Sequence, residues 1–206
     1  MIKSFAVLSI AALATAAHAQ VRITEWMYNG NDGEYIEITN TGASPVSMVG
    51  WSFDDNSQAF GSFALDSLGT LQPGQSAIIT EIAAADFRTN WGLSASVPVI
   101  GLNGQNLGRS DEMNIYNGST LVDRLTYNDQ GAFPVNGPRT QNVSGNTLPS
   151  NWGANNANGW FLSSVGDAYG SRTGLNGDIG NPGIVLPTPG AAALLGLGGL
   201  IVGRRR

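Results

Sequence analysis

Two glutamates, Glu25 and Glu37, are the residues whose type and spacing could do chemistry. They lie in two successive segments, 21–28 and 34–40, that read as neighbouring β-strands. Glycosidases use two carboxyl groups about 5 to 9.5 Å apart as acid, base or nucleophile. One hypothesis is therefore a secreted carbohydrate-active hydrolase. The other is structural: both carboxylates accept hydrogen bonds from backbone or hydroxyl groups near a sheet edge.

Other common catalytic chemistry is excluded by composition. The only histidine and the only lysine lie within the first 18 residues, and there is no cysteine. A Ser-His-Asp triad is therefore impossible in the rest of the chain. Cysteine catalysis, thiolate metal sites and disulfides are excluded too, and zinc is disfavoured. The sequence predicts no catalytic residue, no metal ligand set and no cofactor.

Two further features could bind a ligand. The turns at 29–34 and 54–56 are rich in Asn and Asp, and such oxygen atoms can bind calcium, although neither turn has EF-hand spacing. The alternative is a solvated turn. Trp152 and Trp160 could stack on sugar rings, or they could pin an Asn-rich segment to the core.

The charge of the middle of the chain limits its partners. Residues 20–186 contain six arginines and all fifteen acidic residues, which gives a net charge of −9. Such a surface repels nucleic acid and anionic lipid. We therefore expect no nucleic-acid partner.

The N-terminus has the pattern of a cleavable signal peptide over residues 1–19. One lysine precedes an apolar run over 5–17, which is too short to span a bilayer comfortably. An Ala-His-Ala sequence then ends at Ala19, so cleavage before Gln20 is predicted. A buried N-terminal helix is the alternative.

The C-terminus, residues 184–206, has a second hydrophobic pattern. Fourteen uncharged residues over 190–203 precede three terminal arginines. As a helix they would rise only about 21 Å, less than the roughly 30 Å of a hydrocarbon core. The arginines fit the positive-inside rule. We expect a short hydrophobic helix that gives weak or transient membrane anchoring.

Between these ends, short alternating runs separated by Gly, Asn, Asp and Pro indicate strands. Strands are expected at 21–28, 34–40, 46–53, 60–65, 76–81, 112–117 and 120–127, and one short helix at 83–91. The segment 131–183 shows no regular period and is expected to wrap irregularly over the sheets, held by its aromatic residues. This pattern is typical of an all-β, antiparallel two-sheet sandwich.

The segment 33–42, Gly-Glu-Tyr-Ile-Glu-Ile-Thr-Asn-Thr-Gly, resembles a signature of the lamin tail domain. Further pieces follow in that family's order: Val46–Asp55, Leu71–Gly74, Asp111–Ile115, Leu121–Tyr127 and the closing Gly180-Asn181-Pro182-Gly183. Ser110 departs from the usual Gly. The resemblance implies an immunoglobulin-like β-sandwich over 20–183, used as a binding or scaffolding module, with no catalytic residues to carry over.

The tail resembles the PEP-CTERM sorting signal: Pro187-Thr188-Pro189, an apolar run and terminal arginines. Thr188 replaces the Glu of that motif. The resemblance implies an exosortase-type enzyme that cuts near Pro187 and Pro189, in addition to signal peptidase at Ala19 and Gln20.

Together these patterns predict an exported bacterial surface or extracellular-matrix protein. We expect a non-catalytic binding or scaffolding role, with an extracellular polysaccharide or another surface protein as partner. The hydrolase that uses Glu25 and Glu37 stays the alternative.

Overall fold

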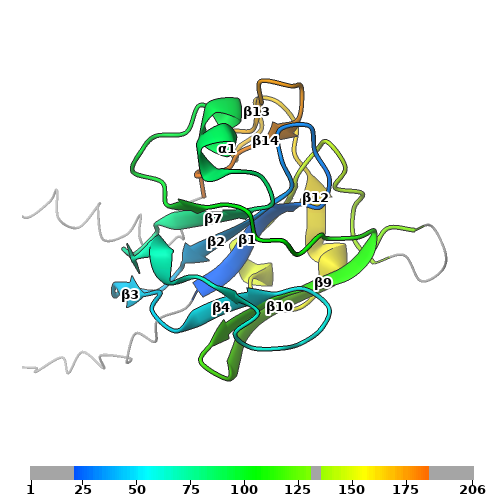
Figure 1. Ribbon diagram of the computed structural model, residues 1–206. Coiled ribbons are helices and arrows are strands. Elements are labelled where there is room, and N and C mark those ends of the chain that lie inside the picture. The colour runs from blue at the N-terminus through cyan, green and yellow to red at the C-terminus, as the bar shows by residue number, and fades with distance from the viewer. Residues whose placement is uncertain (1–20, 131–135, 186–206) are drawn as a thin grey trace, which may run out of the picture.

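Two neighbouring strands, β1 (Val21–Met27) and β2 (Tyr35–Asn40), form the centre of the fold. The computed structural model describes residues 21–130 and 136–185 (Figure 1). The strict alternation of β2 directs Ile36 and Ile38 into the main core, so its other side chains point to the opposite face. This alternation gives the strand pair two different buried faces.

The larger sheet has six strands in the order β12-β11-β1-β2-β7-β8. Its remaining strands are β7 (Ser76–Thr80), β8 (Val99–Ile100), β11 (Gly145–Thr147) and β12 (Trp160–Leu162). All pairs are antiparallel except β7 with β8, which is parallel. The expected purely antiparallel sandwich is therefore wrong at this edge, because α1 lies between β7 and β8 and returns the chain in the same direction.

The smaller sheet has four strands in the order β10-β9-β4-β5. They are β4 (Trp51–Asp54), β5 (Phe63–Ala64), β9 (Ser110–Asn117) and β10 (Thr120–Asn128). Two small ribbons pair β3 (Val46–Ser47) with β6 (Thr70–Leu71), and β13 (Arg172–Thr173) with β14 (Ile179–Gly180). The helices are α1 (Ala84–Trp91) and three single 3-10 turns, Asp66–Leu68, Pro149–Asn151 and Ala157–Gly159.

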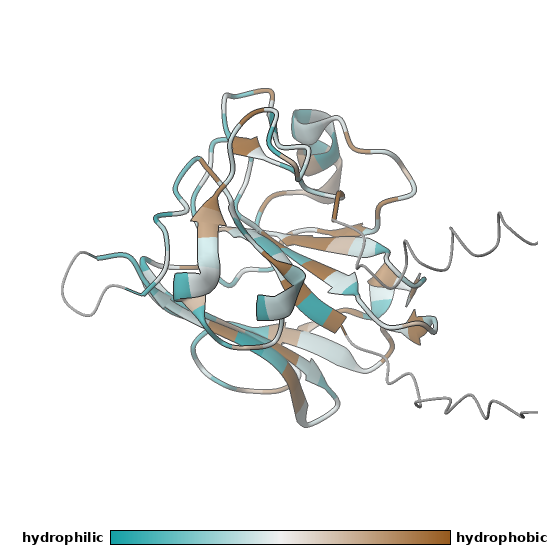
Figure 2. Cartoon of the chain, turned by 180° about the vertical axis from the view of Figure 1, so that it is seen from behind, coloured by the Kyte–Doolittle hydropathy of each residue, from teal (hydrophilic) through white to brown (hydrophobic). Residues whose placement is uncertain are grey.

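The main core lies between the two sheets, which Figure 1 shows one above the other. Trp26 and Ile36 of the large sheet pack there with Phe53, Ile115 and Tyr127 from the small sheet. The ring centroids of Trp26 and Tyr127 are 4.1 Å apart. Hydrophobic and hydrophilic residues mix along the strands in Figure 2, as expected when successive side chains point to opposite faces. This mostly-β arrangement with one short helix is consistent with the expected immunoglobulin-like sandwich.

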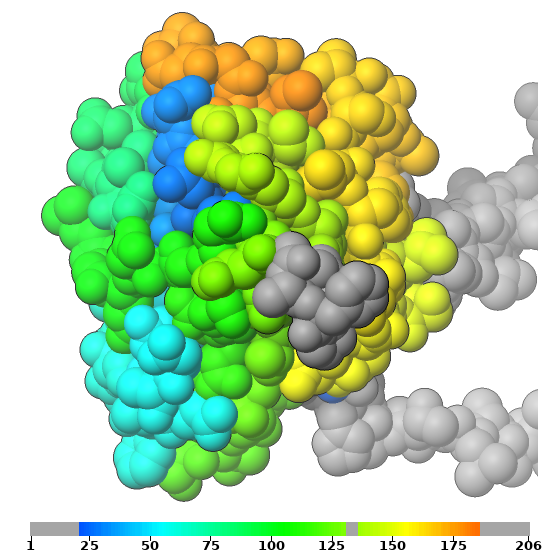
Figure 3. Space-filling view, turned by 90° about the vertical axis from the view of Figure 1, so that its right-hand side faces the viewer, coloured from blue at the N-terminus to red at the C-terminus, as the bar shows by residue number. Residues whose placement is uncertain are grey.

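A third layer covers the other face of the large sheet. Phe87 and Trp91 of α1 form a second core with Tyr35 and Ile78, as their spacing of four residues on the predicted helix suggests. Beside α1 lie β13 and β14, which Figure 1 labels above the sheet. We call residues 171–185 the closing segment. In Figure 3 the late part of the chain, in orange, lies against blue residues of the early part.

Two further expectations need correction. The strand expected over 46–53 is broken into β3 and β4, because Gly50 adopts a positive φ of 79° and the Trp51 amide bonds back to Met48. The segment expected to be irregular supplies β11 and β12, which extend the large sheet. Within the described ranges, no helix is long and apolar enough to cross a membrane. The expected signal helix and C-terminal helix lie outside those ranges.

Candidate functional site

The strand register brings the two predicted glutamates together. Glu25 of β1 is the direct partner of Glu37 of β2, and both side chains have no exposed surface. A register irregularity between Ile23 and Glu25 lets Thr24 and Glu25 share the face to which Glu37 points. Both strands lie in the interior of the sheet, so the expected position near a sheet edge is wrong.

Glu25 accepts three hydrogen bonds through one oxygen. Its Oε1 atom accepts from the Tyr35 hydroxyl at 2.7 Å, the Ser144 hydroxyl at 2.5 Å and the Asn181 amide at 2.8 Å. Its Oε2 atom is buried and has no hydrogen-bond partner within the described residues. These donors come from β2, from the residue before β11 and from the closing segment, so one carboxyl group joins three distant parts of the chain.

Glu37 makes the matching contacts on the neighbouring strand. Its Oε1 atom accepts from the Thr24 hydroxyl at 2.8 Å, and its Oε2 atom accepts from the Gly183 amide at 2.6 Å. The closing segment is thus held by both glutamates, two residues apart on its own backbone. This arrangement confirms the structural hypothesis in part, since the partners are backbone and hydroxyl groups. We call Glu25, Glu37 and these donors the carboxylate latch.

Burial raises the pKa of both glutamates above the usual range. For Glu25 the loss of hydration is the main cause, opposed by the bonds from Asn181, Ser144 and Tyr35. For Glu37 burial acts first, and the nearby Glu25 carboxyl raises the pKa further. Two adjacent buried carboxyl groups resist carrying two negative charges. We infer that at least one of them holds a proton at neutral pH.

The geometry does not offer these carboxyl groups to a substrate. General acid–base catalysis needs a group within hydrogen-bonding reach of the reacting atom. Here Glu25 and Glu37 are fully covered, and Gly180 lies so close that a Cβ atom on it would be 2.5 Å from the Tyr35 hydroxyl and 3.1 Å from Glu25 Oε1. What the pair does in this structure is fasten the closing segment to the large sheet.

A second pair of carboxylates supports the same segment. Asp178 accepts a hydrogen bond from the Asp32 amide at 2.7 Å, and Asp32 accepts from the Asp178 amide at 3.2 Å and the Asn176 amide at 2.9 Å. Both carboxylates are fully buried. The solvated turn expected here is therefore wrong, because the carboxylate of Asp32 binds backbone N–H groups of the closing segment.

The second acidic turn, at 54–56, also has a buried carboxylate that accepts hydrogen bonds from the protein. Asp54 is 1% exposed and accepts hydrogen bonds from Ser57, Ala59 and Ser62, which organise the loop that follows β4. N–H and O–H donors, which compete with a cation for carboxylate oxygens, occupy both turns. Across residues 21–130 and 136–185, no group of three or more His, Cys, Asp or Glu side chains is placed to hold a metal ion.

The two tryptophans considered for sugar binding differ in their placement. Trp160 is 8% exposed and belongs to the main core, with its ring centroid 6.5 Å from that of Trp26. This confirms the structural hypothesis for Trp160. Trp152 is partly buried, and its indole nitrogen is buried without a partner among the described residues. The ring of Trp160 is therefore not a free platform for a ligand.

Sequence reasoning missed the donors that complete the latch. Ser144, Asn181 and Gly183 contribute two of the bonds to Glu25 and one to Glu37, across more than a hundred residues. The closing Gly-Asn-Pro-Gly motif was the available signal, because it ends the resemblance to the family. The predicted processing residues Ala19, Gln20, Pro187 and Pro189 lie outside the described residues.

The chain was compared with models of protein families and with curated protein sequences. The family model of the lamin tail domain matches residues 14–129, which is more than half of the chain and includes both glutamates of the latch. No curated protein sequence matches the chain. The strand that carries the motif at 33–42, β2, also lies at the centre of the fold. The chain therefore belongs to the lamin tail domain family.

Proposed function

We propose that this protein is an exported bacterial surface or extracellular-matrix protein whose lamin tail domain is a non-catalytic binding or scaffolding module. Signal peptidase removes residues 1–19, and an exosortase-type enzyme acts on the tail at 184–206. The partner is an extracellular polysaccharide or another surface protein. No cofactor takes part.

The observation that carries this proposal is the position of the folded elements relative to the two predicted cuts. The first strand begins at Val21 and the last ends at Gly180, so every described strand lies between Gln20 and Pro187. Removal of either end would break none of the strand pairs. The latch holds the chain at Asn181 and Gly183, just before the predicted cut.

The burial of the glutamates supports a non-catalytic role. A hydrolase would need the closing segment to leave, since it covers both carboxyl groups. Departure would leave the Asn181 and Gly183 amides without these acceptors. It would also uncover Val97 and Leu93, which lie within 4 Å of the Cβ position of Gly183. If hydrolysis of a glycan were measured and survived replacement of both glutamates by Gln, the carboxylate-pair mechanism would be ruled out.

Intact-mass spectrometry of the protein recovered from its own cells and medium tests the export proposal. We expect a mass that begins at Gln20 and lacks the residues after about Pro187. A variant with Pro187→Ala and Pro189→Ala should keep its C-terminus, whereas Ile184→Ala, a control outside the motif, should be processed normally. A chain that still ends at Arg206 in the membrane fraction would make the tail a simple anchor and contradict the sorting proposal.

A further inference from the structure

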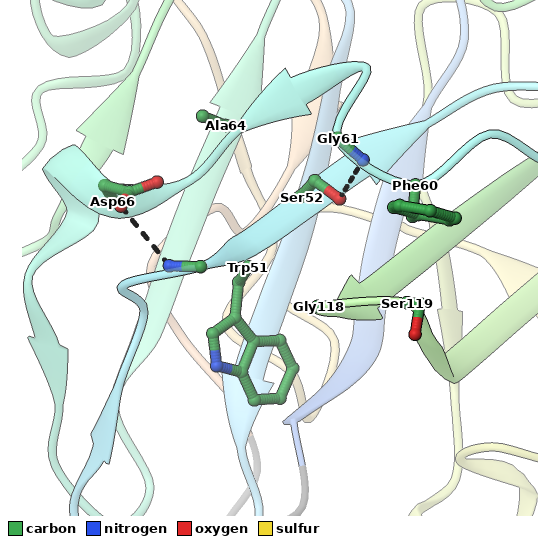
Figure 4. A pocket seen from close by; sticks show the side chains of 9 residues that line it. Trp51, Ser52, Phe60, Gly61, Ala64, Asp66, Gly118 and Ser119 are labelled. Carbon is green, nitrogen blue, oxygen red and sulfur yellow. Dashed lines mark hydrogen bonds between the residues drawn. The ribbon is translucent and has the colours of Figure 1, made fainter.

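A hollow of about 270 Å³ lies at the end of the smaller sheet, where β4 begins and the β9–β10 hairpin turns. Figure 4 shows it between the Phe60 ring, the turn at Gly118 and Ser119, and the residues around Asp66. The Gly118 amide donates to the Gly50 carbonyl at 2.9 Å, so two turns are bonded together beside it. The hollow therefore has a fixed base.

A large apolar side chain at the hollow, Phe60, is 62% exposed. Its loop is nevertheless fastened on both sides. The Ala59 amide donates to Asp54 at 3.1 Å, and the Gly61 amide donates to the Ser52 hydroxyl at 2.8 Å. The Ser62 hydroxyl also donates to Asp54 at 2.6 Å. These bonds hold the backbone on both sides of Phe60, so that binding to its exposed ring costs little ordering of the loop.

Three glycines line the hollow. Gly50, Gly61 and Gly118 all have positive φ values, and a Cβ atom on any of them would meet nothing within 4 Å. The buried Trp51 and the exposed Ala64 supply apolar surface beside the ring. Polar groups stand at the rim: Asp66 and Ser119 are both exposed. Apolar walls with a few polar groups that fix orientation are the usual composition of a small-ligand site.

The chemistry of this site fits a sugar ring. One face of a pyranose is made of C–H groups that pack on an aromatic ring, and its edge carries hydroxyl groups that donate to a carboxylate or exchange bonds with a serine. Asp66, together with the net charge of −9 over residues 20–186, disfavours an acidic sugar. We propose that the hollow at Phe60 binds a neutral sugar unit of an extracellular glycan. This inference rests on the proposed function, because it places the protein among such polymers.

Isothermal titration calorimetry of the full chain tests the site. The probes are cellohexaose, laminarihexaose, mannohexaose and chitohexaose, with an oligogalacturonate of matched length as the acidic control. We expect at least one neutral probe to bind and the acidic one not to. Phe60→Ala should weaken that binding about tenfold or more, the scale expected for losing a ring contact and its buried area. Phe60→Tyr should keep it.

A matched control separates the ring from general surface effects. Val49→Ala shortens an exposed apolar side chain, 68% exposed, that does not line the hollow, and binding should not change. Thermal unfolding of each variant checks that it is folded. Binding that survives Phe60→Ala, or no binding by any neutral probe, would overturn the proposal. Neither result bears on export, because the mass of the native protein is measured independently.

Discussion

Replacing Glu25 by Ala should destabilise the protein by about 3 kcal/mol. The substitution removes the acceptor of the Tyr35 hydroxyl, the Ser144 hydroxyl and the Asn181 amide. Ser144 keeps a partner in the Ser163 hydroxyl at 2.7 Å, so two buried donors lose their acceptor. Each such donor costs about 1–3 kcal/mol. Some of this cost is offset, because the carboxyl group itself is costly to bury.

The measurement is urea unfolding at pH 5, below the raised pKa of about 7 of the buried Glu25 carboxyl group. A loss of about 3 kcal/mol corresponds to a fall of roughly 6–12 °C in Tm for a domain of this size. Hydrogen exchange at the Asn181 and Gly183 amides should accelerate more than exchange in β9, because the latch holds the closing segment locally.

Two controls sharpen the result. Glu25→Gln keeps an acceptor oxygen at the same place and resembles the protonated acid, so it should cost less than about 1 kcal/mol. Asp86→Ala removes an exposed carboxylate on the first turn of α1 and should cost about 0.5 kcal/mol. The reasoning would be refuted if Glu25→Ala cost less than about 1 kcal/mol, or if Glu25→Gln cost as much as Glu25→Ala.

Three further outcomes are expected. Burial raises the pKa of Glu25 to about 7, of Glu37 to about 8 and of Glu34 to about 9, from an ordinary 4.5. Between pH 4.5 and 9 the folded state therefore binds more protons than the unfolded state. The contribution of these groups to stability is greatest below pH 4.5. The free energy of unfolding should fall by more than about 1 kcal/mol as the pH rises toward 9. Urea unfolding of a Glu25→Gln, Glu37→Gln variant should show a shallower fall. A variant whose stability falls with pH as steeply as that of the wild type would contradict the assignment to these carboxyl groups. Gly180→Ala should cost about 1–3 kcal/mol, because its Cβ atom would meet the latch, and a wild-type Tm would contradict that packing. Phe87→Ala should cost about 3–5 kcal/mol by emptying the core under α1, a loss that unfolding would reveal as a lower midpoint.

Local sequence patterns determined the centre of the fold. The alternation over 34–40 needs only neighbouring residues to be recognised, since successive side chains of a strand point to opposite faces. The spacing of Phe87 and Trp91 likewise marks one face of a short helix. For the same reason, the motif at 33–42 identified the family before any strand pairing was known.

The later strands β11 and β12 could not be predicted from the sequence, because their local patterns are weak. The strand β11 is only Gly145–Thr147, with no apolar alternation, so nothing local distinguishes it from a loop. It becomes a strand because β1 offers it an unpaired edge, with Glu25 opposite Asn146 and Trp26 opposite Gly145. Backbone pairing with a distant partner decides such a segment.

The role of the two glutamates was decided by tertiary structure alone. The sequence placed Glu25 and Glu37 on adjacent strands, which is compatible with an acid–base pair and with a structural role. The closing segment, about 150 residues further along, brings the Asn181 and Gly183 amides onto them and removes both from water. Burial and hydrogen-bond partners set what a carboxyl group can do, and both come from contacts that no local pattern encodes.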